Sequence, residues 1–312
     1  MRLTASNPGN DYRLGGDEAP PAIVSMYLGE AVEEVLESIV SSTPMDYKKN
    51  NLKDFSISSL SYLPRDNSDR NRTSPVAFTG NKFEFRMLAS SLNASNLTLT
   101  INTILADELR EISKKLESNK HRQDIRKAAL KICIELIKEH NKVLFSGDGY
   151  SKEWEKEAQK RGLPNIKTYY ESIKYFLDDK SIDLYSRNGV FTKEEIISRG
   201  YIFYEDYASK KMIEAKTLVD MIRVMSLPAI RKEIIELNKC NLECDKPLIN
   251  KLASFVEEAL KLCTDIDEEI SKVTKISDMC KKGNALLQNV VPLMTKLRDS
   301  YDNIEKYLNP DN

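Results

Sequence analysis

Residues 81–87 read NKFEFRM, and this short stretch decides how the first part of the chain folds. Two phenylalanines and a methionine alternate in it with Glu84 and Arg86. Because successive side chains of a β-strand point to opposite faces, the alternation predicts a strand at about 82–88 with one apolar, buried face. The opposite face carries the carboxylate and the guanidinium together, so it can line a site.

Outward from this strand, further strand candidates are few. They are the opening residues 2–5 and residues 55–62, each short and flanked by turn-forming residues. Between them, apolar residues recur at helical spacing after Pro20-Pro21, which predicts a helix at about 21–39. The chain therefore begins as loops, short strands and one helix.

The remainder of the chain is long, charged and helical. Apolar periodicity predicts helices at about 96–118, 123–145, 151–161, 167–178, 192–238, 246–282 and 285–308. Pro228 and Pro292 lie inside two of these segments, where a missing amide proton should kink or split the helix. We therefore expect an α+β fold, in which a small sheet is followed by a mostly α-helical C-terminal bundle.

A heptad pattern marks the last helices. Apolar residues in 252–273 are spaced alternately four and three apart, and 290–308 repeat the pattern. Two such seams predict an antiparallel coiled-coil hairpin within 246–308 that turns near Gly283-Asn284. Packing inside one chain is the commoner interpretation of the seams, and contact between subunits is the alternative.

Composition excludes several classes of function. The chain has 47 basic and 48 acidic residues and a formal net charge of −1, which argues against nucleic-acid binding or a polybasic membrane function. No apolar run approaches the ~20 residues of a transmembrane helix, and the start lacks the apolar core of a signal peptide. The five cysteines form no CxxC pair, and Cys240 and Cys244, which are four apart, lie far in sequence from both histidines, which disfavours a zinc site. A cytoplasmic protein with reduced thiols is expected.

Two arginine-bearing stretches precede the strand. Residues 13–20 read RLGGDEAP, and residues 70–75 read RNRTSP. Arginine presents a rigid fork of donors that pairs two-pronged with carboxylate or phosphate, and a glutamate on a glycine-rich loop can move as a proton-handling lid must. The set suits an anionic substrate beside a metal. Taken singly, each residue fits a loop ion pair or a solvated strand face equally well.

The three stretches occur in this order in glutamine synthetases, and the chain resembles the type III branch of that family. The resemblance is carried by GNDYRLG at 9–15, EAPPAIVS at 18–25 and the continuous stretch 70–86. It covers the whole chain and is most specific through residue 98. The long helical tail is also a trait of this branch.

On the substrate side, the resemblance implies roles for three residues. Arg13 matches the arginine that holds the carboxylate of the substrate glutamate. Glu18 matches the flap glutamate that closes the site and takes a proton from ammonium, a catalytic role. Arg72 matches an arginine that stabilises the phosphoryl group during transfer, also a catalytic role.

The resemblance implies three further roles near the nucleotide. Glu84 matches a glutamate that binds the metal, Mg²⁺ or Mn²⁺. Arg86 matches a catalytic arginine that faces the transferred phosphate and the reacting carboxylate. Arg70 is assigned to the phosphates of ATP.

The activity implied by the resemblance is ATP-dependent ligation of ammonia to glutamate through a γ-glutamyl phosphate. Its partners would be glutamate, ammonium and ATP, within a homo-oligomer. Negative charge builds up on both reacting groups, so arginines and a divalent metal suit the reaction. Ammonium must lose a proton before it can attack, and a closed lid protects the acyl phosphate from water.

The resemblance also divides the chain. Residues 1–118 would hold the last strands of the catalytic half-barrel, and 119–312 a helical C-terminal domain. The family's other metal ligands precede the position of Arg13, so we expect an N-terminally incomplete fragment that is inactive without the missing N-terminal half. The alternative hypothesis is a helical assembly protein that retains relic ligase motifs.

Overall fold

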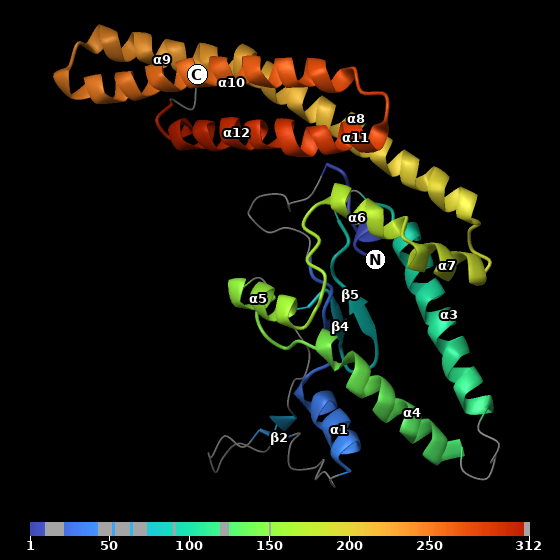
Figure 1. Ribbon diagram of the computed structural model, residues 1–312. Helices are drawn as coiled ribbons and strands as arrows, with labels where there is room; N and C mark the ends of the chain where they lie inside the picture. Colours follow the sequence, from blue (N-terminus) through green and yellow to red (C-terminus); the bar gives the residue numbers. More distant parts are fainter. Residues whose placement is uncertain are drawn as a thin grey trace, which may run out of the picture. The chain divides into compact units, whose positions relative to one another are not determined.

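A computed structural model gives the structure of this chain (Figure 1). It describes residues 1–9, 22–42, 52–53, 63–64, 74–89, 92–118, 125–149 and 151–308. Contacts divide the chain into two compact units, Met1–Lys193 and Glu194–Asn312. The boundary predicted between residues 118 and 119 separates two family domains, whereas these units are defined by contacts within the structure. That boundary therefore stays a prediction.

A three-stranded sheet forms the centre of the first unit. It consists of β1 (Met26–Tyr27), β4 (Val76–Phe78) and β5 (Phe83–Phe85), with β4 in the middle. β1 runs parallel to β4, and β5 runs antiparallel to it. Gly80 turns the chain between β4 and β5 with a φ of 91°, a conformation that favours glycine. The strand predicted at 82–88 is confirmed in its central residues.

A second pair of short strands belongs to the same unit. β2 (Leu52–Lys53) pairs antiparallel with β3 (Leu63–Pro64). The strand predicted at 55–62 lies outside the described residues.

Two predictions near the start of the chain were wrong. Residues predicted to end a strand form a 3-10 helix, η1 (Leu3–Ala5). The helix predicted from residue 21 begins only at Glu30, as α1 (Glu30–Ser41). The apolar residues before it pair with β4 instead, and Gly29, with a φ of 86°, separates this extended run from the helix.

Five helices follow in the first unit. They are α3 (Ser95–Glu117), α4 (Ile125–His140), α5 (Lys152–Lys160), α6 (Tyr169–Phe176) and α7 (Asp179–Arg187), with a short 3-10 turn η3 (Asn141–Val143) after α4. The first four confirm the predicted helices to within a few residues, whereas α7 was not predicted.

Side-chain caps explain where the shorter helices begin. Ser151, Thr168 and Asp178 each accept a hydrogen bond from a backbone amide in the first turn of α5, α6 and α7. Thr168 and Glu171 form a reciprocal capping box. These caps satisfy amides that a helix start leaves without partners.

The apolar face of β5 is only partly buried. Met87 is 1% exposed and packs with Ala5 and Leu97, and Phe85 joins that cluster. Phe83, in contrast, is 60% exposed. The prediction that this whole face belongs to the core was therefore wrong for Phe83, which lies at the turn end of the strand.

The second unit consists of helices joined by short turns over its described residues. Its elements are α8 (Lys193–Met221), a π-helical turn η4 (Ile222–Ser226), α9 (Leu227–Cys240), η5 (Glu243–Asp245), α10 (Lys246–Thr274), α11 (Met279–Ala285), a second π-helical turn η6 (Leu286–Val290) and α12 (Val291–Glu305). In Figure 1, α9, α10 and α12 lie side by side. Over the part of the chain that the structure describes, no helix is long and apolar enough to cross a membrane.

α10 and α12 run antiparallel. Lys251 contacts the hydroxyl of Tyr307, which follows the end of α12. Glu258, further along α10, accepts a hydrogen bond from Ser300 on α12, which precedes Tyr307 in the sequence. The turn between α10 and α11 lies at residues 275–278, so the predicted turn near Gly283-Asn284 was wrong. Gly283 is instead buried inside α11, which begins after its N-cap Asp278.

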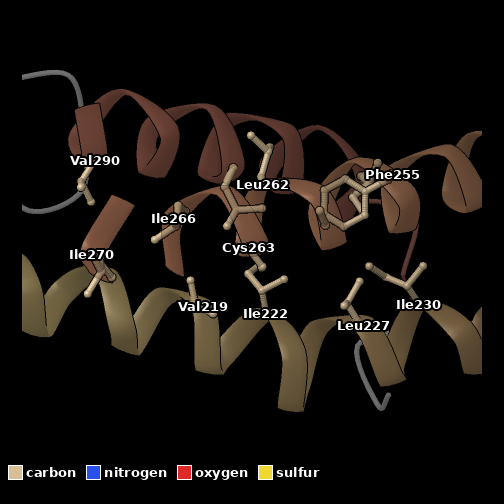
Figure 2. Packing of buried hydrophobic residues seen from close by; sticks show 14 of the residues in the cluster. Val219, Ile222, Leu227, Ile230, Phe255, Leu262, Cys263, Ile266, Ile270 and Val290 are labelled. Carbon is tan, nitrogen blue, oxygen red and sulfur yellow. The ribbon is translucent and has the colours of Figure 1, made fainter. Parts of the chain in front are cut away.

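The seam of α10 packs inside this unit. Figure 2 shows Val219, Ile222 and Leu227 of the α8–α9 rod pointing toward α10. Cys263 and Ile266 of α10 are fully buried against them. Packing within one chain therefore accounts for the apolar seam.

The two prolines inside the predicted helices each follow a π-helical turn. Pro228 is the second residue of α9 and Pro292 the second of α12, directly after η4 and η6. In each turn an amide bonds five residues back, from Leu227 to Ile222 in the first case. The wider turn accommodates a residue that lacks an amide proton, so each helix continues instead of splitting.

Candidate functional site

The β4–β5 hairpin positions the two described site residues. Glu84 on β5 lies opposite Ala77 on β4, which is fully buried. The amide of Arg86 donates to the carbonyl of Pro75 over 2.7 Å, which extends the strand pairing beyond β5. The hairpin ladder therefore fixes the backbone of both charged residues.

Glu84 and Arg86 form an ion pair on one face of the strand, as the alternating pattern predicts. Arg86 donates from Nε over 3.2 Å and from Nη2 over 3.1 Å to the same oxygen, Oε2 of Glu84. Lys82 Nζ lies 3.3 Å from the other carboxylate oxygen. The Arg86 side chain is 16% exposed and that of Glu84 37% exposed, so solvent reaches the carboxylate.

These two cations determine the ionisation of Glu84. The hydrogen bond from Arg86, followed by that from Lys82, lowers the pKa of the Glu84 carboxyl below its ordinary value, and slight desolvation opposes them. The carboxylate is therefore ionised at neutral pH, the form that either a metal or a cationic side chain requires.

A metal ion needs more ligands than this hairpin offers. Mg²⁺ and Mn²⁺ favour several oxygen ligands in near-octahedral order. Within the described ranges, no group of three or more His, Cys, Asp or Glu residues could hold an ion. The described residues therefore do not by themselves fit a metal site, and the metal-binding role of Glu84 stays a prediction.

The other four predicted site residues, Arg13, Glu18, Arg70 and Arg72, lie outside the described residues. Their convergence with Glu84 and Arg86 is therefore untested. The hydroxyl of Ser74, within the second arginine stretch, lies 2.9 Å from that of Ser25 and donates to the carbonyl of Phe145 over 3.1 Å. This buried network ties three distant parts of the sequence together beside β4.

Sequence reasoning missed a buried polar cluster on α3. Asp107 is 4% exposed and accepts hydrogen bonds from Nε of Arg187 over 2.8 Å and from Nδ2 of Asn188 over 3.0 Å. The Arg187 hydrogen bond lowers the pKa of Asp107 to about 2, despite burial. The signal was present, because Thr100, Thr103 and Asp107 recur at helical spacing on the buried side of α3.

Known proteins resemble this chain over nearly its whole length. A family model described as the glutamine synthetase C-terminal domain matches residues 128–243. The type-3 glutamine synthetase of Dictyostelium discoideum is 32% identical over 98% of this chain and 44% of its own length. The glutamine synthetase of Butyrivibrio fibrisolvens is 34% identical over 98% of the chain and 45% of its own length.

A third relative agrees with these two. The glutamine synthetase of Bacteroides fragilis (strain YCH46) is 30% identical over 98% of the chain and 44% of its own length. The chain thus spans less than half the length of each relative. The resemblance carried by the stretches around Arg13, Arg72 and Glu84 agrees with these matches, which extend over 98% of the chain. The chain belongs to the glutamine synthetase family, and one of these relatives is named a type-3 enzyme.

Proposed function

We propose that this chain supplies part of the catalytic site for ATP-dependent ligation of ammonia to glutamate. The observation that carries the proposal is the Glu84–Arg86 pair on one face of β5, in a sequence related to glutamine synthetases over 98% of its length. In this proposal β1, β4 and β5 are the last strands of a larger catalytic half-barrel.

Arg86 is suited to stabilise a transferred phosphoryl group. Its guanidinium presents two donors to one carboxylate oxygen of Glu84. The same fork can pair with phosphate oxygens, which carry the charge that accumulates during phosphoryl transfer. A group that binds there would compete with Glu84 for the guanidinium.

The remaining roles in the proposal rest on family membership. Arg13 would bind the substrate carboxylate, Glu18 would take the proton from ammonium, and Arg70 and Arg72 would contact phosphate groups. A divalent metal, when bound, would neutralise phosphate charge. Glu84 could take part in such a site only with ligands from beyond the described residues.

We also propose that the 312-residue chain has no activity by itself, since it matches under half of each relative. The test is the γ-glutamyl hydroxamate assay on the purified chain, with ATP, glutamate, hydroxylamine and either Mg²⁺ or Mn²⁺. No ATP-dependent product is expected. Robust turnover would overturn this part of the proposal.

A chimera tests the catalytic role directly. This chain would replace the matching segment of the Butyrivibrio relative, and the product would be assayed in the same way. We expect activity that Glu84→Gln and Arg86→Lys each abolish. Glu111→Gln, which removes another carboxylate with a lysine partner, is the matched control and should have no effect. A well-folded chimera that is inactive, or one that tolerates Glu84→Gln, would contradict the proposal.

The second candidate is an assembly role, and an exposed apolar strip favours it. Met221, Val224, Met225 and Ile235 are between 50% and 73% exposed along α8, η4 and α9. Ile266 and Ile270 in the seam of α10 are buried in the core, so aspartate there would disrupt folding and would not test assembly. If the strip joins subunits, Val224→Asp with Met225→Asp should reduce the mass measured by light scattering. An unchanged mass would remove the support.

A further inference from the structure

The first unit contains a cavity of about 340 Å³ that neither Glu84 nor Arg86 lines. Its walls come from η1, α3, α6, α7 and the segments that contain Val24 and Ile166, and they are mostly apolar, with Leu3, Ile104, Phe176 and Leu184 also among them. The volume lies at the lower end of the range of small-molecule sites. Apolar cavities of this kind favour organic ligands over water.

Most hydroxyl groups in the wall already donate their single proton in a hydrogen bond within the protein. Thr4 donates to the carbonyl of Met1 over 3.1 Å, Ser172 to that of Tyr169 and Ser181 to that of Tyr175, the last two over 2.6 Å. Because a hydroxyl has one proton and two lone pairs, each of these can only accept a further hydrogen bond.

The same logic assigns the proton between Thr100 and Tyr185. Their oxygens are 2.8 Å apart, and Thr100 donates its proton to the carbonyl of Asn96, also over 2.8 Å. Tyr185 must therefore donate to Thr100, which leaves its own oxygen as an acceptor. Tyr185 is 3% exposed, and burial raises the pKa of its hydroxyl, so it stays neutral.

Charged groups in the wall do not select an ion of either sign. Arg2 is 4% exposed, and its guanidinium donates to the carbonyls of Ile166 and Lys167. Asp178 has the opposite charge and caps α7 through the amide of Ser181.

We propose that this cavity is a binding site for a small, neutral, largely apolar molecule with one N–H or O–H group. The ligand donates that proton to the hydroxyl oxygen of Tyr185, and the apolar walls hold the rest of the molecule. The site is independent of the proposed ligase chemistry.

Indole and benzofuran are the probes that test this site. They have nearly the same shape, but only indole carries a donor. Calorimetric titration of the full chain should give about tenfold tighter binding for indole, the factor that one ordinary hydrogen bond supplies. Equal affinities, or no saturable binding of either probe, would overturn the proposal.

Two isosteric variants locate the hydrogen bond. Tyr185→Phe removes the acceptor, so the preference for indole should disappear while benzofuran binds as before. Thr100→Val removes the group that accepts the Tyr185 proton, so the Tyr185 hydroxyl can donate into the cavity. The affinity for benzofuran should then rise relative to that for indole. A preference for indole that survives Tyr185→Phe would refute the assigned acceptor.

A matched pair on α3 tests the location of the cavity. Ile104→Trp places an indole ring in the cavity and should abolish probe binding, whereas Leu105→Trp, at a residue that is 53% exposed, should leave it unchanged. Circular dichroism and thermal melting establish that each variant is folded. Binding that persists in folded Ile104→Trp would overturn the location.

Discussion

Arg187 on α7 binds the carboxylate of Asp107 on α3 through two nitrogens, although 80 residues separate them in the sequence. Asn188 adds a third hydrogen bond to the same carboxylate. The guanidinium remains largely in solvent while the carboxylate is buried. Asp107 therefore joins two helices of the first unit and must stay ionised to do so.

This pairing predicts acid sensitivity of the first unit. Because the folded-state pKa of Asp107 is about 2, below its ordinary 3.8, its stabilising contribution is complete above the ordinary value. It is lost as the pH falls through about 2. Asp107→Asn should cost about 2 kcal/mol of unfolding free energy at pH 7, as for hydrogen bonds to a charged group, and far less at pH 2.

Denaturant unfolding between pH 7 and pH 2 would measure this difference. Asp302→Asn is the control, because Asp302 and its partner Arg298 are both exposed. Its effect should stay below about 0.5 kcal/mol. A pH-independent effect of Asp107→Asn would contradict the ionic role.

The pKa of Glu84 is predicted to respond unequally to its two partners. Hydrogen bonding from Arg86 is the largest cause of the lowered pKa, and it comes from two nitrogens of a side chain that is 16% exposed, whereas the Lys82 side chain is 65% exposed. Arg86→Ala should therefore raise the pKa of Glu84 further than Lys82→Ala does. Carboxyl-detected NMR titration would measure both, with Glu111 as an internal reference that neither change should move. An equal or reversed order would show that the hairpin geometry differs in solution.

The seam of α10 is predicted to contribute to stability according to burial. Ile266 is fully buried, whereas Leu260 on the same helix is 41% exposed. Ile266→Ala should cost about 2–5 kcal/mol because it leaves a cavity in a packed core. Leu260→Ala should cost under about 1 kcal/mol. Similar midpoints of chemical unfolding for the two variants would contradict the packing described for this unit.

Because a π-helical turn precedes it, Pro228 is predicted to have little effect on the stability of the protein. Pro228→Ala should change stability by less than about 1 kcal/mol, since Pro228 lies in the first turn of α9 after η4. Lys216→Pro, at an exposed residue inside α8, should cost about 3 kcal/mol or more because no wide turn precedes it. Thermal melting of the two variants checks this, and equal costs would refute the role assigned to η4.

Local patterns predicted much of the fold, and one clear error arose from a long-range contact. The period-two alternation around Glu84 placed it beside Arg86 correctly, because that relationship depends on only three consecutive residues. The start of α1 was misplaced because Met26–Tyr27 pairs with β4, some 50 residues later, and no local pattern signals such a partner.

A glycine gave rise to another wrong prediction in the second unit. Gly283 was interpreted as a turn former, but it is buried inside α11, and the chain turns before the Asp278 cap. α7 was missed because it is short, although Asp178 carries the signal of a helix start. For the candidate site, only Glu84 and Arg86 lie among the described residues, so the family resemblance remains the basis for the other four.

The parallel pairing of β1 with β4 brings Tyr27 next to Ala77. The polypeptide that leaves the sheet after β1 thus returns to an adjacent strand, about 4.8 Å away. Lengthening the segment between β1 and β4 costs little stability, since the entropic cost of closing a loop rises by only about 0.6 kcal/mol for each doubling of its length. A reporter domain spliced after Ser42, at the end of α1, should therefore leave the carboxylate and guanidinium on β5 where they are.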